Sequence, residues 1–239
     1  MRVLVIASRK GGAGKTTVAG HLAVEAERSG DGPVALIDVD PQGSLADWWN
    51  NREGAAPHFV QTTLPRLDDD ILRLKDSGPG FLIVDTPPAL TATISQVIAH
   101  ADLVVIPTRP SPHDLRSIGS TMDVAESLNK DMVFVINCAA PRTRITYETI
   151  ALLSQHGTVA PTVLHQRVDF ACSMIDGRTV MEVAGGSKSA GEVRELWYFL
   201  RQRMDRRRPK SDLVLPTRVP LNEDSRVLAQ SEFNLEGQV

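Results

Sequence analysis

The sequence predicts an α/β fold in which a doubly wound, mostly parallel sheet is flanked by helices. Short apolar runs alternate with longer stretches of helical periodicity along most of the 239 residues. Each run is apolar at consecutive positions, which is typical of strands that helices cover on both faces. A chain of this length also fits one α/β domain better than two.

The predicted elements follow one another in a regular order. We expect strands at residues 3–7, 34–38, 81–85, 103–107 and 133–137, with a weaker pattern at 158–164. Helical patterns occupy residues 15–29, 44–51, 66–76, 91–100, 112–129, 143–155 and 188–204. Because ligands bind beyond the carboxyl ends of the strands in such sheets, the residues that follow each apolar run are the candidate site.

The last part of the chain differs in character. Residues 201–210 contain six basic side chains and one acidic one, and three prolines then oppose a long helix. We therefore predict one domain at residues 1–205 and a basic, then proline-containing and poorly ordered C-terminal tail at 206–239.

Composition narrows the class of protein. The net charge of −3 does not indicate a nucleic-acid partner, so any such surface is local. Two cysteines are too few to crosslink the chain, and we find neither a signal peptide nor an apolar run of membrane-spanning length. These features exclude secreted, membrane-spanning and wholly disordered proteins, and they indicate a cytoplasmic enzyme or switch.

A glycine-rich loop follows the first strand. The segment SRKGGAGKTT (8–17) departs from the ordinary phosphate-loop pattern, because the first glycine of that pattern falls at Arg9. The loop glycines still allow successive N–H groups to converge on phosphate oxygens, and the following helix adds its positive end. Lys15 can reach the β- and γ-phosphates, and the Thr16 hydroxyl can hold Mg²⁺.

The segment KGGAGKTT resembles the deviant Walker A loop of the ParA/MinD family of dimerising ATPases. The resemblance is greatest to small partition ParA proteins that lack an N-terminal helix-turn-helix, and it implies a phosphate-loop NTPase domain. It also implies that Lys10 reaches the partner subunit's nucleotide in an ATP-bound homodimer, as an arginine finger would. The nucleotide-binding residues it implies are Gly11, Gly12, Ala13, Gly14, Lys15, Thr16 and Thr17.

Acidic side chains follow two later strands. Asp38 and Asp40 can both lie at the mouth of the second strand, where carboxylates bind Mg²⁺ or orient water. By the family's DxDPQ motif, Asp40 positions the hydrolytic water and Asp38 supports the metal. Asp85 ends an apolar strand in the Walker B form and would hold a water of the Mg²⁺ shell. The predicted catalytic residues are thus Lys10, Lys15 and Asp40, and the predicted metal residues are Thr16, Asp38 and Asp85.

Two later segments extend the resemblance. TRPSPHDLRSIG (108–119) is similar to the proline-rich IP-x-x-PSP-x-D segment of small partition ATPases, which helps to build their dimer, although a stiff loop alone explains it equally well. Asn137 ends a strand where the family uses an asparagine against adenine. In the adjacent pair Trp48 and Trp49, we expect one ring in the core and the other partly exposed, with a partner contact as the alternative.

The last helix carries the predicted DNA contacts. The resemblance implies non-specific DNA binding at this end of the fold, through Lys188, Arg194, Arg201 and Arg203. The alternative is a solvated helix end whose arginines complement the helix dipole.

The function implied by the resemblance is a Mg²⁺-ATP-dependent switch with weak basal ATP hydrolysis. Its ATP-bound dimer would bind nucleoid DNA in the cytoplasm and partition plasmid or chromosome DNA through a ParB-like, centromere-binding partner. The same ATPase could instead position a protein cargo, such as a chemoreceptor cluster or a microcompartment, through another adaptor. A metabolic phosphate-loop enzyme or a membrane-surface switch fits less well, because we see neither an extra small-molecule pocket nor a basic amphipathic C-terminal helix.

Overall fold

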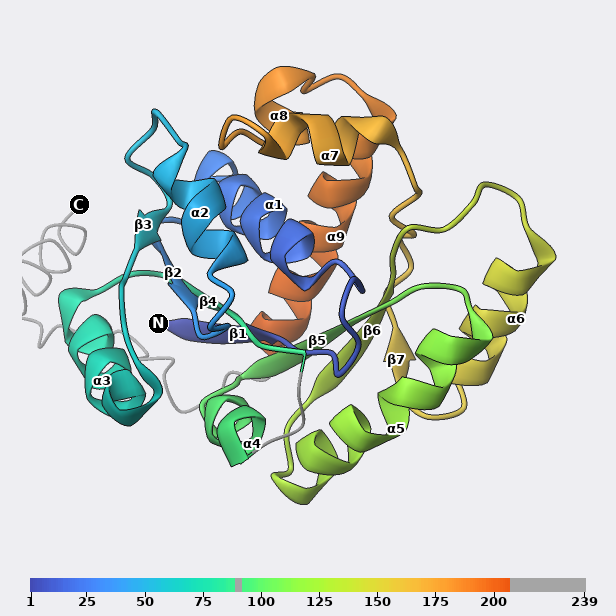
Figure 1. Ribbon diagram of the computed structural model, residues 1–239, viewed down its shortest axis with the longest axis horizontal. Helices are drawn as coiled ribbons and strands as arrows, with labels where there is room; N and C mark the ends of the chain where they lie inside the picture. The colour runs from blue at the N-terminus through green and yellow to red at the C-terminus, as the bar shows by residue number, and fades with distance from the viewer. Residues whose placement is uncertain (89–91, 207–239) are drawn as a thin grey trace, which may run out of the picture. The chain divides into compact units, whose positions relative to one another are not determined.

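The computed structural model describes residues 1–88 and 92–206, which form one sheet with helices on both faces (Figure 1). The sheet has seven strands in the order β3-β2-β4-β1-β5-β6-β7, and every pairing is parallel. The predicted doubly wound α/β class is confirmed. The predicted tail at 206–239 lies outside the described residues except for Arg206, which ends the last helix.

The five strong apolar runs are strands, each within one residue of its predicted bounds. The strands are β1 (Arg2–Ile6), β2 (Val34–Asp38), β3 (His58–Phe59), β4 (Phe81–Asp85), β5 (Leu103–Thr108), β6 (Met132–Ile136) and β7 (Thr158–Val159). The weak run at 158–164 contributes only β7, because Pro161 has no amide hydrogen for a ladder. The edge strand β3 was not predicted, since two residues are too few for a pattern.

The seven predicted helices are present with small changes at their ends. They are α1 (Lys15–Arg28), α2 (Ser44–Asn50), α3 (Leu67–Ser77), α4 (Ala92–Ala99), α5 (Pro112–Ser127), α6 (Arg144–Leu153) and α9 (Lys188–Arg206). A 3₁₀ turn, η1 (Leu64–Arg66), precedes α3. Two short helices were missed, α7 (Val168–Met174) and α8 (Val180–Val183), and they lie over one end of α1 and α9 (Figure 1).

Two apolar layers hold the sheet. Alternate residues of β1 point to opposite faces, so Leu4 and Ile6 join the layer that α1, α2, α8 and α9 cover. Val3 and Val5 join the layer beneath α3, α4 and α5. Burial on both faces explains why the strands are apolar at consecutive positions. Among the described helices, none is both long and apolar enough to cross a membrane.

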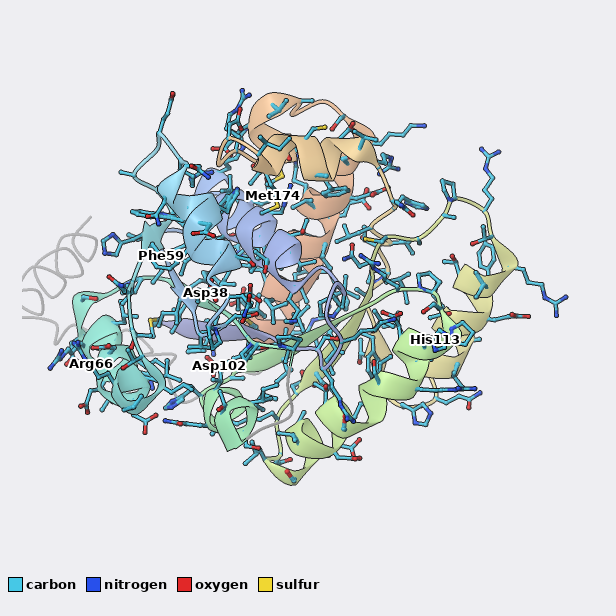
Figure 2. All side chains as sticks on the ribbon, in the orientation of Figure 1. Asp38, Phe59, Arg66, Asp102, His113 and Met174 are labelled. Atoms are coloured by element: carbon cyan, nitrogen blue, oxygen red, sulfur yellow. The ribbon has the colours of Figure 1, made fainter. Side chains whose placement is uncertain are left out.

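The α7–α8 segment is attached to α1 through a buried histidine. His21 donates from Nδ1 to the Thr17 carbonyl (2.8 Å), and its Nε2 accepts from the Val180 amide (3.3 Å). Burial lowers the pKa of His21 to about 4, so the ring is neutral at pH 7 and can accept at Nε2. Met174 lies at the end of α7, above α1 (Figure 2).

The two adjacent tryptophans of α2 occupy different environments, as expected for neighbours on a helix. Trp48 is buried and donates to the Arg178 carbonyl at 3.0 Å. Trp49 is partly exposed, stacks on Phe59 and donates to the Pro57 carbonyl at 2.8 Å. The prediction that one ring lies in the core and the other is partly exposed is confirmed.

Candidate functional site

The glycine-rich loop lies at the carboxyl edge of the sheet, where β1 ends between β4 and β5. Gly12 and Gly14 have φ values of +77° and +88°, in the left-handed region that favours glycine. Gly14 directly precedes α1, whose first residue is Lys15. The sequence thus forms a loop that ends at a helix N-terminus, the arrangement that binds phosphate through backbone N–H groups.

Asn137 fixes the end of this loop. Its side-chain amide is buried and donates to the Ala13 carbonyl at 2.8 Å. A methyl group added at Gly14 would overlap the amide nitrogen of Asn137. The amide that the resemblance assigns to the adenine edge therefore positions the loop here, and its contact with a base remains a prediction.

Lys15 is buried where the loop enters α1. Its exposed fraction is 7%, and burial lowers its pKa against the opposing attraction of Asp85 and Asp40. A desolvated ammonium group at the start of a helix is well suited to a polyphosphate, because a buried cation gains more from an anionic ligand than an exposed one does.

Thr16 and Asp85 lie together beside the loop. The Thr16 hydroxyl donates to Oδ2 of Asp85 at 2.6 Å, and the Thr86 amide donates to Oδ1 at 3.0 Å. Burial is the largest influence on Asp85 and raises its pKa to about 7. A buried carboxylate beside a threonine hydroxyl fits Mg²⁺, which takes few protein ligands and completes its shell with water and phosphate oxygens. The residues present therefore fit a Mg²⁺-nucleotide.

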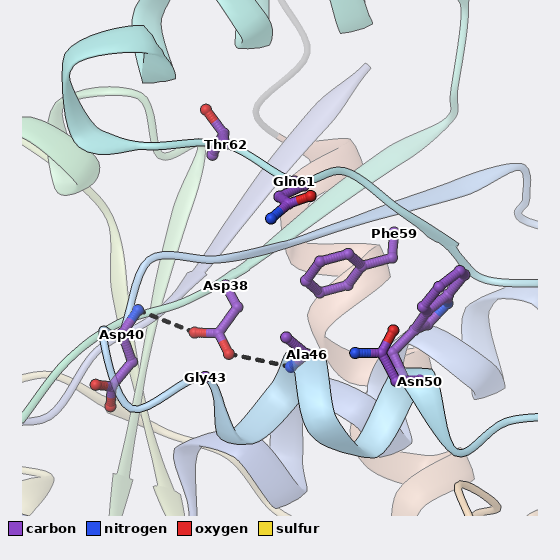
Figure 3. Close-up of a pocket in the computed structure, with 9 residues that line it drawn as sticks. Asp38, Asp40, Gly43, Ala46, Asn50, Phe59, Gln61 and Thr62 are labelled. Atoms are coloured by element: carbon purple, nitrogen blue, oxygen red, sulfur yellow. Dashed lines mark hydrogen bonds between the residues drawn. The ribbon is translucent and has the colours of Figure 1, made fainter.

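Asp38 and Asp40 lie at the mouth of β2 but have different surroundings (Figure 3). Asp38 accepts from the amides of Asp40 (2.9 Å), Leu45 (2.9 Å) and Ala46 (3.1 Å), so it holds the start of α2. Burial nevertheless raises its pKa. These contacts show a structural role for Asp38, and its predicted support of the metal stays a prediction.

Asp40 is better placed to act on water. Its carboxylate accepts from the Gln42 amide at 3.0 Å and is only partly buried. A cavity of ≈ 380 Å³ opens beside it, with Asp38, Trp49, Phe59 and Gln61 among its lining residues. A carboxylate that faces solvent and lies close enough to attract Lys15 could orient a water molecule for attack on a bound phosphate.

Lys10 contacts a different carboxylate from those near Lys15. Its Nζ lies 2.6 Å from Oδ2 of Asp114, whose side chain is only 4% exposed, while Lys10 is 36% exposed. The Ser111 hydroxyl donates to the same carboxylate oxygen at 2.5 Å, and Oδ1 of Asp114 is buried without a partner among the described residues. In this conformation the lysine expected to act in trans is bound within its own chain.

Asp114 was absent from the predicted site residues. The position of Asp114 in the proline-rich segment after β5 was the available signal, because the loops after β1 and β5 leave neighbouring strands at one edge. The other predicted residues of the loop, Gly11, Ala13 and Thr17, lie where expected between β1 and the first turn of α1.

The four predicted DNA contacts on α9 do not form one surface. Arg203 binds Asp131 through two hydrogen bonds of 2.7 and 2.8 Å, and Arg201 lies 3.0 Å from Asp31. Arg194 donates to the Gly185 carbonyl, and Lys188 is exposed without a polar partner among residues 1–88 and 92–206. At about 100° per residue, Arg203 lies on the side of α9 opposite to Arg201. The DNA role of these residues stays a prediction.

Comparison with known proteins agrees with a nucleotide-binding role for the loop. The model of the CobQ/CobB/MinD/ParA nucleotide-binding domain matches residues 4–180. The chain is 31% identical over 205 residues to maintenance of carboxysome distribution protein A of Halothiobacillus neapolitanus, covering 81% of this chain and 93% of the relative. It is 26% identical to the chromosome-partitioning ATPase Soj of Thermus thermophilus, covering 82% and 94%.

A solved structure shares the fold. The chain superposes with a TM-score of 0.68 and 17% identity on a plasmid partition protein of Borrelia burgdorferi bound to AMPPNP, covering 84% of this chain and 99% of the other. At this level of identity the likeness concerns the fold.

Proposed function

The chain belongs to the CobQ/CobB/MinD/ParA nucleotide-binding family, and on that premise we propose that it is a Mg²⁺-ATP-dependent dimerising ATPase that partitions plasmid or chromosome DNA. ATP joins two subunits, the dimer binds nucleoid DNA without sequence preference, and a cargo-bound, ParB-like partner stimulates slow hydrolysis. The dimer then separates, and repeated binding and release on the nucleoid move the cargo. Named relatives that act in chromosome partition support this proposal.

The observation that carries the proposal is the second lysine of the phosphate loop. Lys10 is partly exposed, and it contacts Asp114 rather than the acidic residues that attract the buried Lys15, so a neighbouring subunit could meet it. Its ion pair with Asp114 must open before Lys10 can bind another subunit's phosphates. Exchange of one anionic partner for another makes dimerisation depend on a bound triphosphate.

Each remaining side chain has a defined part. Lys15 and the loop amides bind the phosphates of the chain's own nucleotide, while Thr16 and Asp85 hold Mg²⁺. Bound there, Mg²⁺ would neutralise part of the negative charge of the phosphates. Asp40 orients the attacking water through its solvent-facing carboxylate, and Asp38 keeps the start of α2 in place.

DNA binding would be electrostatic and therefore sensitive to salt. Of the four predicted contacts, Lys188 and Arg194 are the exposed ones and have the weakest carboxylate contacts, because Arg194 lies 4.0 Å from Glu25 whereas Arg201 and Arg203 lie 3.0 Å and 2.7 Å from Asp31 and Asp131. We therefore assign DNA contact to Lys188 and Arg194 first.

A protein cargo is the second candidate. The similarity to a carboxysome-distribution protein across most of both chains supports it specifically. Both candidates share the ATPase cycle and differ in the adaptor, so the test of the cycle is common to them.

Retention of the chain on non-specific DNA tests the proposal. The wild-type protein should co-sediment with mixed-sequence DNA in ATP and Mg²⁺ but not in ADP, and added salt should release it. Lys15→Ala should abolish retention because it removes the buried cation of the loop, whereas Lys75→Ala, on α3 and far along the chain from the loop, should not. Equal retention in ATP, in ADP and without nucleotide would contradict the proposal.

A further inference from the structure

Arg109 lies beside the phosphate loop although a long stretch of sequence separates them. Strands β1 and β5 pair in parallel, with Ile6 opposite Val105, so the chain leaves both strands at the same edge of the sheet. Thr108 ends β5, and Arg109 follows it directly. The topology thus brings the connection from β5 to α5 alongside the loop that follows β1.

The side chain of Arg109 contacts the loop at one point. A methyl group built at Gly12 would lie 3.9 Å from Nη2 of Arg109, so the guanidinium group packs against that glycine. The backbone around Arg109 is constrained, because the Ser111 amide donates to its carbonyl at 2.7 Å and prolines occupy positions 110 and 112. The guanidinium group is therefore presented from a stiff connection.

The charge of Arg109 is unbalanced within the described structure. The Arg109 side chain is exposed, and its guanidinium group forms no hydrogen bond or ion pair with any residue in 1–88 and 92–206. Lys10 is paired with Asp114, and Lys15 is attracted by Asp85 and Asp40. Arg109 is thus a cation next to the loop that remains available to an anionic ligand.

Arg9 is the other exposed arginine near the loop, and it differs in placement. It also has no ion pair within those residues, but it does not come within 4 Å of a methyl group built at Gly11 or Gly12. Proximity to the loop glycines therefore singles out Arg109.

We propose that Arg109 binds the terminal phosphate of the ATP held by its own chain and so makes the site favour ATP over ADP. This inference rests on the proposed function, because it requires that the loop bind a nucleotide. A guanidinium group presents a planar fork of donors that matches two phosphate oxygens, and no proton transfer is needed. ADP lacks the phosphate that this contact would use.

Nucleotide affinity tests the proposal without reference to hydrolysis. The full chain would be titrated with Mg²⁺-AMPPNP and with Mg²⁺-ADP by isothermal calorimetry. Arg109→Ala should weaken AMPPNP about tenfold, the usual effect of one hydrogen bond to a charged group, and ADP less than about twofold. The AMPPNP affinity of Arg109→Lys should lie between those of the wild type and Arg109→Ala, because lysine keeps the charge but lacks the planar pair of donors.

Two matched variants separate this contact from other effects. Arg116→Ala removes an exposed arginine of α5 that has no ion pair within the described part of the chain, and it should leave both affinities unchanged. In the Lys10→Ala background, where we expect no dimer, the Arg109→Ala effect should persist, since the contact lies within one chain.

The outcomes distinguish the proposals. Wild-type AMPPNP affinity in Arg109→Ala, an equal loss for AMPPNP and ADP, or loss of the effect in the Lys10→Ala background would each overturn the assignment of Arg109. If nucleotide binding depends on Lys15 while Arg109→Ala is silent, the proposed function stands and this inference fails. If Lys15→Ala leaves nucleotide binding intact, the proposed function itself fails.

Discussion

Replacement of Gly14 by alanine tests how the phosphate loop is held. Gly14 has φ +88°, and a left-handed conformation costs alanine about 1 kcal/mol. The new methyl group would also displace the Asn137 amide and break its 2.8 Å hydrogen bond to Ala13, which contributes about 1 kcal/mol. We expect Gly14→Ala to lower the free energy of unfolding by about 2 kcal/mol.

A double-mutant cycle separates the two contributions. Asn137→Ala alone should cost about 1 kcal/mol because the Ala13 carbonyl loses its donor. In that background the methyl group at position 14 meets no amide, so only the backbone strain remains. The double variant should cost about 2 kcal/mol rather than the additive value of about 3 kcal/mol. Urea unfolding followed by tryptophan fluorescence measures all four proteins, and an additive result would refute the reasoning.

Gly11 provides the matched control. A methyl group at Gly11 meets nothing within 4 Å, and its φ is outside the left-handed region. Gly11→Ala should therefore change the free energy of unfolding by less than about 0.5 kcal/mol. A stability loss as large as that of Gly14→Ala would show that strain is spread over the loop rather than placed at its last glycine.

Three further predictions concern stability and coupling. His21 has a pKa of about 4 in the folded chain, whereas free histidine has a pKa of about 6.5, so protons favour the unfolded chain between these values. Lowering the pH from 8 to 5 should therefore reduce the free energy of unfolding by about 2 kcal/mol in the wild type, and His21→Gln should not show this loss. Equal pH dependence of the two proteins in urea unfolding would contradict this. Arg203→Ala should lower the free energy of unfolding by about 2 kcal/mol, because it removes the ion pair with the buried Asp131. Lys188→Ala should lower it by less than about 0.5 kcal/mol. Equal losses in thermal unfolding would contradict the structural role of Arg203. Asp114→Asn should allow ATP-dependent dimers at about tenfold lower protein concentration in sedimentation velocity, because Lys10 then has no ion pair to break before it binds the other subunit. Unchanged dimerisation would show that the ion pair does not restrain Lys10.

The sheet could be predicted because its strands are buried on both faces. Five runs such as VALID and FLIVD contain enough consecutive apolar residues to be recognised, and their bounds were correct within one residue. The edge strands β3 and β7 each pair with their neighbour at only two positions, so β3 has no recognisable pattern and β7 has only the weak one at 158–164. Helices α7 and α8 were missed for a related reason, since long-range contacts such as His21 with Val180 hold them.

The candidate site was predicted in part. The loop and Thr16 could be found because a strand, a glycine-rich turn and a helix follow each other in the sequence, and Asp85 because it ends a separate apolar strand. The contact between Asn137 and Ala13 joins residues from distant segments, and an adenine role alone would not suggest it. The electrostatic pairing of Arg203 with Asp131 was equally hidden, because a basic helix end has the same sequence whether or not its arginines are paired.

The central claim is that two chains share bound ATP, each contributing Lys10 to the other's nucleotide. Light scattering of Asp40→Ala, which should bind ATP without hydrolysing it, tests this directly. In saturating ATP and Mg²⁺ we predict twice the mass of one chain, and Lys10→Ala in the same background should remain a single chain. A single-chain mass for Asp40→Ala, or a dimer that survives Lys10→Ala, would contradict the account.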